Sequence, residues 1–189
     1  MADRGTMALE IEAKLKVESH GPVRDALKRE QATRLGVIEQ TDVFFDRPDG
    51  SLRASGYALR VRSEARSDEA RPSAVLTVKG PVRPGAYKTR EEIELALPDA
   101  QQGRRLVTLL GFVEVFVLQK RRERWQLGAC RVELDELPRL GTFVEIEGPS
   151  DAAVGGVQRR LGLQGLTHIA NSYLGLVQTL IESHPSRSR

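Results

Sequence analysis

The chain has 189 residues, of which 40% are hydrophobic and 29% charged, and its formal net charge is +3. This length suits one domain with a substantial core, and interleaved acids and bases disfavour a nucleic-acid-binding protein, which more often shows a basic stripe beside aromatic residues. The only cysteine, Cys130, excludes an intramolecular disulfide and a cysteine-based zinc site, and no apolar run is long enough to span a membrane.

The first predicted element is a strand over residues 7–17. Between Leu9 and Leu15 apolar and charged residues alternate strictly, which is the period of a β-strand and cannot form one face of a helix. Glu10, Glu12 and Lys14 therefore stand in a row on one face of this strand.

The rest of the chain alternates between strands and helices, and nothing in it marks a linker between domains. Further strands are predicted at residues 37–47, 58–62, 75–79, 88–95, 112–118, 119–127, 129–136 and 142–148. Helices are predicted at residues 22–35, 99–110, 151–162 and 167–182. Asp99 suits the N-cap of the second helix and Ser150 or Asp151 that of the third, while Gly36 and Gly111 end the first two helices.

The remaining segments are predicted to be irregular. Residues 63–73 are polar and broken by Pro72, which indicates a mobile loop. We expect a flexible leader at 1–6, one domain at 7–182 and a flexible tail at 183–189. The leader contains no signal-peptide core, so we expect a cytoplasmic protein that is a monomer or a homodimer and has no nucleic-acid or membrane partner.

The pattern of the first strand, with charged residues on one face, recurs in strands along the whole chain. Charged residues at alternate positions share a face of their strand. These sets are Arg60 and Arg62; Lys88, Arg90, Glu92 and Glu94; Lys120, Arg122 and Arg124; Arg131, Glu133 and Asp135; and Glu145 and Glu147. One interpretation is a solvated outer face of an antiparallel sheet. In the other, about eight strands close into a barrel, the helices at 22–35, 99–110 and 167–182 cover its apolar outside, and the charged face lines a polar interior. The alternation alone is compatible with both.

A polar interior of this kind would suit one class of ligand. Several arginines and lysines facing inward need an anion of high charge density, and both side chains bind phosphate oxygens. Glutamates beside them would repel phosphate unless a hard cation such as a magnesium or manganese ion (Mg²⁺ or Mn²⁺) lies between. The barrel interpretation therefore predicts a polyphosphate ligand with a divalent metal.

The segment from Glu10 to Lys14 resembles the ExExK signature of the CYTH superfamily, also called triphosphate tunnel metalloenzymes. The resemblance extends over about residues 7–180. It is carried by Gln40 to Asp46, Leu59 to Arg62, Leu76 to Pro81, Lys88 to Glu94, Lys120 to Arg122, Val132 to Asp135, Phe143 to Gly148 and Ser172 to Leu174. Three segments look most like the class IV adenylyl cyclase (CyaB-like) branch, namely Gln40 to Asp46, Lys88 to Glu94 and the terminal Ser172-Tyr173. One departure is Phe44, where relatives often have Tyr.

The resemblance implies an α+β fold, an eight-stranded antiparallel β-barrel whose charged tunnel binds triphosphate and whose helices pack on the outside. It implies metal-binding carboxylates at Glu10, Glu12, Glu145 and Glu147, with Glu92, Glu94 and Asp135 as further candidates. It implies phosphate-binding bases at Arg60, Arg62, Lys79, Lys88, Arg90, Lys120 and Arg122. Lys14 would face phosphate or orient water, and with Glu10 and Glu12 it forms the catalytic group.

Three functions follow from this resemblance. The first is a divalent-metal-dependent adenylyl cyclase that converts ATP to cyclic AMP and pyrophosphate. The second is an inorganic or thiamine triphosphatase, and the third is a non-catalytic polyphosphate-binding module, against which the retained glutamates count. No stretch of the sequence indicates a pocket for adenine.

Other residue types suggest structural roles. His20, His168 and His184 are far apart in the sequence, which favours solvated or packing positions. Tyr173 is expected to pack on its helix and Trp125 to lie in the core. Asp46 suits a turn as well as a tunnel wall.

Overall fold

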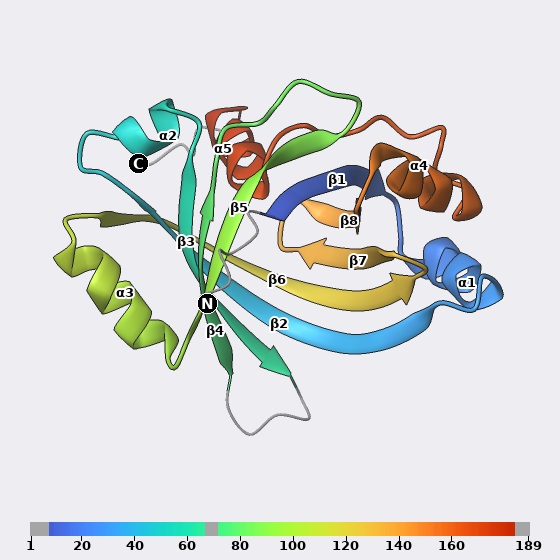
Figure 1. The fold of residues 1–189 in the computed structure, drawn as a ribbon, viewed down its shortest axis with the longest axis horizontal. Coiled ribbons are helices and arrows are strands. Elements are labelled where there is room, and N and C mark those ends of the chain that lie inside the picture. The colour runs from blue at the N-terminus through green and yellow to red at the C-terminus, as the bar shows by residue number, and fades with distance from the viewer. Residues whose placement is uncertain (1–7, 67–71, 184–189) are drawn as a thin grey trace, which may run out of the picture.

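The computed structural model describes residues 8–66 and 72–183, and in it eight antiparallel strands form one closed barrel (Figure 1). This confirms the predicted fold class. The strands, in chain order, are β1 (Ala8–Val17), β2 (Thr33–Asp46), β3 (Ala58–Arg66), β4 (Ser73–Lys79), β5 (Lys88–Leu97), β6 (Val113–Leu127), β7 (Cys130–Leu137) and β8 (Gly141–Gly148). The helices are α1 (Gly21–Arg29), α2 (Ser51–Ala54), α3 (Ala100–Leu109), α4 (Asp151–Arg160) and α5 (Tyr173–Ser183). The predicted leader, and the predicted tail from residue 184 onward, lie outside the described residues.

The strand register brings the charged positions of neighbouring strands onto the same face of the wall. The order around the barrel is β1-β5-β4-β3-β2-β6-β7-β8. Glu12 lies opposite Lys88 on β5 and opposite Glu147 on β8, and Arg122 on β6 lies opposite Asp135 on β7. Residues directly opposite in an antiparallel pair point to the same side of the sheet. The register therefore gathers the charged faces predicted for separate strands into one interior.

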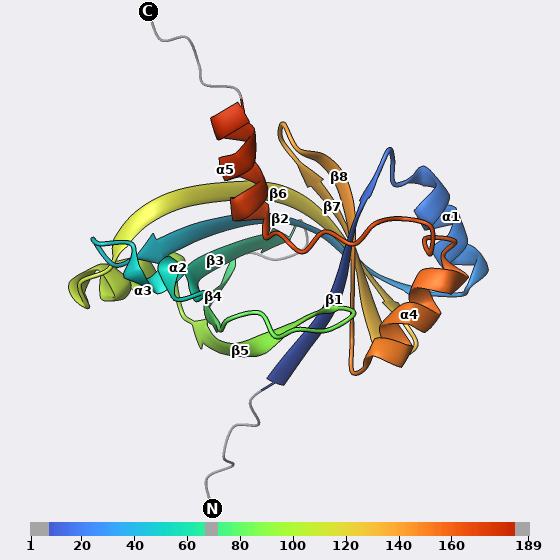
Figure 2. The same ribbon diagram turned by 90° about the horizontal axis from the view of Figure 1, so that it is seen from above.

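Helices cover much of the apolar outside of the barrel, as predicted for the first two. Figure 2 shows α1 and α4 beside β1, β7 and β8, with α2 and α3 at the other side of the molecule. The α1 side chains Val23 and Leu27 pack with Leu15 and Val144 in a buried cluster that also includes Val154 of α4. A second cluster joins Val107 of α3 to buried residues of β2 and β3, namely Val43, Phe45, Leu59 and Val61.

The last helix does not cover the outside, and it begins at Tyr173 instead of residue 167. Tyr173 packs with Leu118, Leu137 and Phe143, and Phe143 lies opposite Asp135 on the inward face of the wall. The prediction that this helix covers the outer apolar face is therefore wrong. β5 pairs with β1 only as far as Glu12, and the freed edge of β1 accepts a hydrogen bond at 2.8 Å from the backbone N–H of Ile169 to the carbonyl of Lys14.

Several boundaries also differ from the prediction. The helix predicted at 22–35 ends at Arg29, because Gln31 adopts a left-handed φ of 56° and β2 begins at Thr33. Gly36, predicted to end that helix, instead has a φ of 124° at a register shift in the β2–β6 pairing. Leu35, which was expected on the apolar helix face, is 40% exposed.

The predicted division of the strands changes at two places. The two strands predicted at 112–118 and 119–127 are one continuous strand, β6. Residues 63–66 extend β3 instead of beginning a loop, and residues 67–71 lie outside the described part of the chain. The short helix α2 was not predicted. The predicted N-caps are confirmed, since the side chains of Asp99 and Ser150 accept hydrogen bonds from backbone N–H groups of α3 and α4.

Two adjacent glycines in α4 have different surroundings. A Cβ at Gly155 would lie 2.7 Å from the hydroxyl oxygen of Tyr87, whereas a Cβ at Gly156 would meet nothing within 4 Å. The Tyr87 ring lies 5.0 Å from the ring of His168, whose Nε2 is 3.0 Å from Oε1 of the buried Gln158. Gly155 therefore lets the residue before Lys88 approach α4, and Gly156 has no such role.

This difference predicts opposite effects of one substitution at adjacent sites. Gly156→Ala should raise the free energy of unfolding by about 0.5–1 kcal/mol, because alanine favours the helix over glycine. Gly155→Ala should lower it by about 1 kcal/mol, because the new methyl group must displace Tyr87. In a Tyr87→Phe background Gly155→Ala should become stabilising. Urea unfolding of the four variants measures this, and equal stabilisation at both glycines in the Tyr87 protein would contradict the contact.

Candidate active site

The interior of the barrel contains a cavity of about 890 Å³ whose wall receives side chains from every strand. The interpretation of a solvated outer sheet face is therefore wrong, and the polar interior is confirmed. The predicted site residues in the wall are Glu10, Glu12, Lys14, Arg60, Arg62, Lys79, Lys88, Arg90, Glu92, Glu94, Lys120, Arg122, Glu145 and Glu147. Asp135 is the one predicted residue that the cavity does not reach.

Glu10 on β1 is held by two bases from neighbouring strands. Its Oε1 lies 2.6 Å from Nζ of Lys79, and its Oε2 accepts a hydrogen bond at 3.0 Å from Nε of Arg90. Burial alone would raise the pKa of Glu10, but the positive charges of Lys79 and Arg90 outweigh it and lower the pKa to about 2. Lys79 is also 3.0 Å from Glu92 on β5, so one ammonium group serves two carboxylates.

The next two inward positions of β1 continue the same pattern. Glu12 accepts a hydrogen bond at 2.6 Å from Nζ of Lys88, and Nζ of Lys14 lies 3.1 Å from Glu145 on β8. Burial acts to raise the pKa of Glu145, but the charges of Lys14 and Arg122 hold it well below its usual range. Each β1 side chain that faces the cavity thus has a partner of opposite charge.

Further ion pairs join β2 to β3, and β6 to β7 and β8. Asp42 accepts two hydrogen bonds from Arg62, at 2.6 and 2.7 Å, in the two-point geometry that arginine makes with carboxylates. Burial opposes ionisation of Asp42, but Arg62 and Arg60 lower its pKa below the usual range. Arg122 contacts Glu133, and its Nη2 lies 2.5 Å from Glu145.

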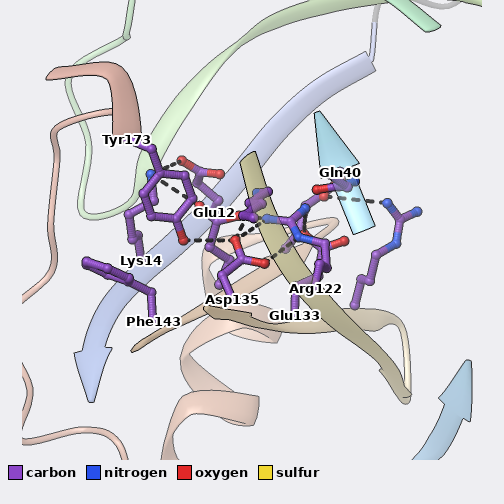
Figure 3. Close-up of polar contacts among 12 residues, drawn as sticks. Glu12, Lys14, Gln40, Arg122, Glu133, Asp135, Phe143 and Tyr173 are labelled. Atoms are coloured by element: carbon purple, nitrogen blue, oxygen red, sulfur yellow. Dashed lines mark hydrogen bonds and ion pairs between the residues drawn. The ribbon is translucent and has the colours of Figure 1, made fainter. Parts of the chain in front are cut away.

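The side chain of Tyr173 extends from the start of α5 to the inward face of the barrel wall, where it contacts Asp135 of β7 (Figure 3). Its hydroxyl donates a hydrogen bond at 2.9 Å to Oδ2 of Asp135, and its ring lies 4.2 Å from Nζ of Lys14 and 4.8 Å from Nζ of Lys120. Asp135 is fully buried and also accepts hydrogen bonds from Lys120 and Arg122. Tyr173 does pack against other side chains, but against Phe143 on the inward face and not on the outside of the barrel, and it also joins two lysines of the cavity wall to this carboxylate.

Two carboxylates of the wall have raised pKa values. Burial, with Glu133 and Glu10 nearby, raises the pKa of Glu147 to about 7. Burial also raises the pKa of Glu92, which faces Glu10 and Glu94. Within residues 8–66 and 72–183 no three histidine, cysteine or carboxylate side chains converge closely enough to hold a metal ion. The available donors are carboxylate oxygens, the ligands that Mg²⁺ and Mn²⁺ prefer, so the residues suit a hard divalent cation by their chemistry.

Sequence reasoning left several wall residues without a role. Asp42, Glu64, Arg124 and Glu133 all lie in the cavity wall. Arg124 binds Glu64 at 2.8 Å and Glu133 at 3.0 Å, and so links β6 to both β3 and β7. Arg124 and Glu133 share the charged face of predicted strands, and that alternation was the signal that could have included them.

The family of the chain follows from a comparison of its sequence with family models. The model of the CYTH domain matches residues 8–173, which contain every strand of the barrel. The chain belongs to the CYTH family. The resemblance found from the ExExK segment onward is thereby confirmed.

Relatives and solved structures agree with this membership. The Methanocaldococcus jannaschii protein MJ0240, a candidate adenylate cyclase, is 32% identical over 139 residues, which are 74% of this chain and 76% of that protein. Adenylate cyclase CyaB of Aeromonas hydrophila is 28% identical over 152 residues, covering 79% and 71% of the two chains. The structure of the candidate adenylyl cyclase HpAC1 from Hippeastrum, which carries a dominant triphosphatase activity, matches with a TM-score of 0.68 and 22% identity over 90% and 95% of the two chains. At that identity the last match shows the fold.

The other singled-out residues have structural contacts. Nε2 of His20 lies 3.0 Å from the carbonyl of Phe143, and Trp125 is buried with the α1 and α4 side chains as predicted. His184 lies outside the described residues. Asp46 lies in the cavity wall and accepts hydrogen bonds from two backbone N–H groups of the turn into α2. No helix among the described residues is long and apolar enough to cross a membrane.

The Asp42–Arg62 pair predicts how stability depends on pH. The folded pKa of Asp42 lies below that of an unfolded aspartate, about 3.9, so its stabilising effect is complete above about pH 5 and is lost as the pH falls through the folded value. Asp42→Asn should lower the free energy of unfolding by about 3–5 kcal/mol at neutral pH, because it leaves the buried Arg62 unpaired. The difference from wild type should shrink below about pH 4.

Urea unfolding between pH 7 and pH 3 measures this difference. Glu39→Gln is the control, since the Glu39 side chain is 67% exposed and lies 3.7 Å from an exposed arginine. A difference for Asp42→Asn that stays constant over this range would contradict the assignment.

Proposed function

We propose that the protein is a divalent-metal-dependent enzyme that acts on a triphosphate, and that its reaction is that of a class IV adenylyl cyclase, in which ATP gives cyclic AMP and pyrophosphate. The observation that carries the proposal is the interior of the barrel, where lysines and arginines from several strands face one cavity beside glutamates. Membership of the CYTH family supports the triphosphate substrate. The names of MJ0240 and CyaB support the cyclase reaction.

The bases of the wall would bind the phosphate oxygens by exchanging partners. Without substrate, Lys79, Lys88 and Arg90 are each within 3.0 Å of a carboxylate oxygen of β1. Phosphate oxygens, like carboxylate oxygens, are anionic acceptors that arginine and lysine bind. Binding of a triphosphate would therefore take over the bases and release the glutamates.

The glutamates of the cavity wall are the residues that would hold the metal. Glu10, Glu12, Glu145 and Glu147 would provide the ligands, with Glu92 and Glu94 as further candidates. A bound Mg²⁺ or Mn²⁺ ion neutralises phosphate charge and acts as a Lewis acid. We assign Asp135 a different role, because its oxygens already accept hydrogen bonds from Tyr173, Lys120 and Arg122. It would position these two bases for the phosphates.

The cyclase reaction requires the ribose 3′-oxygen to attack the α-phosphorus in line while pyrophosphate leaves. Arg62, Lys120 and Arg122 would stabilise the charge that develops on the phosphate oxygens, because they are buried and fixed before the substrate arrives. Lys14 lies between Glu145 and the Tyr173 ring, which holds its ammonium group in place to orient the reacting phosphate or a water molecule.

A triphosphatase is the second candidate, because the same cavity could direct a water molecule at the terminal phosphorus. The dominant triphosphatase activity of HpAC1, on a barrel of the same fold, favours this alternative. A non-catalytic module would need the bases but not the carboxylates that accompany them.

Product analysis distinguishes these functions. We expect the protein with Mg²⁺ or Mn²⁺ to convert ATP to cyclic AMP and pyrophosphate. Parallel incubations contain tripolyphosphate or thiamine triphosphate, and phosphorus NMR identifies the products. Orthophosphate from any substrate without cyclic AMP would replace the cyclase with a hydrolase. Absence of every product would favour a binding module.

Replacement of one glutamate tests the metal assignment. Glu12→Gln should lower metal-dependent turnover by about 100-fold or more, because it removes a charged oxygen ligand and keeps the size of the side chain. The fold should persist, since the amide oxygen of glutamine can accept the hydrogen bond that Lys88 donates to Glu12. Turnover is measured over a range of Mn²⁺ concentrations, with Glu39→Gln as the control. Wild-type turnover in a folded Glu12→Gln protein would show that Glu12 binds no metal.

A further inference from the structure

One edge of β1 changes its pairing partner in the middle of the candidate site. β5 pairs with β1 as far as Glu12, which lies opposite Lys88, the first residue of β5. Alternate residues of a strand present their backbone groups to the same neighbour, so the next position on this edge is the carbonyl of Lys14. It accepts a hydrogen bond at 2.8 Å from the N–H of Ile169. Ile169 belongs to residues 161–172, here called the crossing segment, which runs beside β1 between α4 and α5 (Figures 1 and 2).

The two residues that directly precede this change of partner are in contact with each other. Tyr87 comes immediately before Lys88, and His168 comes immediately before Ile169. The centres of the Tyr87 and His168 rings are 5.0 Å apart, and their planes are inclined by 34°. This separation lies within the range of about 4.5–7 Å in which aromatic rings attract each other. The ring pair therefore joins β5 to the crossing segment where one replaces the other along β1.

Helix α4 holds both rings of the pair in place. Nε2 of the exposed His168 lies 3.0 Å from Oε1 of Gln158, which is only 5% exposed. The amide nitrogen of Gln158 donates a hydrogen bond at 3.1 Å to the carbonyl of Leu163, so its oxygen is the acceptor and Nε2 of His168 carries the proton. The Tyr87 hydroxyl occupies the space that a Cβ at Gly155 would take. The pair is therefore built on a fixed support.

The segments that the ring pair joins lead to two lysines at one carboxylate. Nζ of Lys88 lies 2.6 Å from Oε1 of Glu12, and Nζ of Lys14 lies 4.0 Å from the same oxygen. Nζ of Lys14 also donates a hydrogen bond at 3.3 Å to the carbonyl of Asn171 in the crossing segment. The crossing segment thus binds Lys14 twice, at its backbone carbonyl and at its ammonium group.

We propose that Tyr87 and His168 are positioning residues, which hold the crossing segment against β1 and so fix the ammonium group of Lys14 relative to Lys88. The inference rests on the proposed function, in which Lys14 orients the reacting phosphate or a water molecule. Neither ring belongs to the cavity wall, so both act through other residues and not on the substrate. A small displacement of an orienting group slows a reaction even when the groups that bind the substrate stay in place.

Amide hydrogen exchange of the substrate-free protein, followed by NMR, tests whether the ring pair holds the crossing segment. His168→Ala should speed exchange of the Ile169 N–H about ten-fold, because its hydrogen bond to β1 opens more often when the ring contact is lost. Tyr87→Ala should do the same, whereas Tyr87→Phe keeps the ring and should exchange like wild type. Thr167→Ala is the matched control, because Thr167 is exposed on the same segment.

Steady-state kinetics with Mg²⁺ or Mn²⁺ and a triphosphate that the wild type converts tests the consequence for the reaction. His168→Ala should lower kcat about ten-fold and leave KM within about two-fold of wild type, because the bases on the other strands keep their positions. Tyr87→Ala should have the same effect. The double variant should be no slower than either single variant, because both substitutions remove one contact. Thr167→Ala should turn over like wild type.

The outcomes separate this inference from the proposed function. Unchanged exchange of the Ile169 N–H in His168→Ala would overturn the inference, whatever the protein catalyses. Faster exchange with unchanged kcat would show that the pair only stabilises the fold, and a raised KM at constant kcat would show an effect on binding, so either result would overturn the positioning role. A wild-type protein that converts no triphosphate would overturn the proposed function and the positioning role together, even if the exchange result confirms the contact.

Discussion

The pairing of acids with bases inside a closed barrel is the constraint on which this structure depends. An isolated charge moved from water into a protein interior costs several kcal/mol, so buried charges persist only with partners of opposite sign. Glu12, Lys14 and Asp135 are all less than 9% exposed, and each lies beside a group of opposite charge on another strand. Two requirements therefore fix the strand register. Apolar residues must pack against the helices outside, and charged residues must meet partners of opposite charge inside. A shift of one residue would exchange the two faces and satisfy neither.

The same pairing explains how one cavity can accept an anion and a cation together. A cavity lined by bases alone would attract phosphate, but its lysines and arginines would repel one another when no phosphate is bound. The carboxylates remove that repulsion. They create a different requirement, because a triphosphate that takes the bases leaves Glu10, Glu12 and Glu145 without partners. A divalent cation satisfies those oxygens. Burial and neighbouring carboxylates already raise the pKa values of Glu147 and Glu92 before any exchange, and a bound cation would favour their charged forms.

Alternation in the sequence predicted most of this wall because the strand period is local. The side chain at every second position must point to the same side, so Glu10, Glu12 and Lys14 could be placed on one face without knowledge of any partner. The choice between inside and outside is not local, and it rested on the resemblance to a known family. The boundary errors have the same origin. The left-handed Gln31 and the continuity of β6 depend on pairing with distant strands, and Tyr173 leaves the expected helix face because its hydroxyl reaches Asp135.

The barrel wall and the loops at its end differ in how firmly the structure holds their residues. The residues that we propose bind phosphate project from strands that pair on both sides, so their positions are determined by the whole barrel. Residues in the loops at the end of the barrel have fewer partners, so a substitution there alters few other contacts. Strand residues suit a group common to all triphosphates, and loop residues suit the group by which they differ. A barrel whose inner wall binds the phosphates could therefore accept different substrates through changes in the loops at its end.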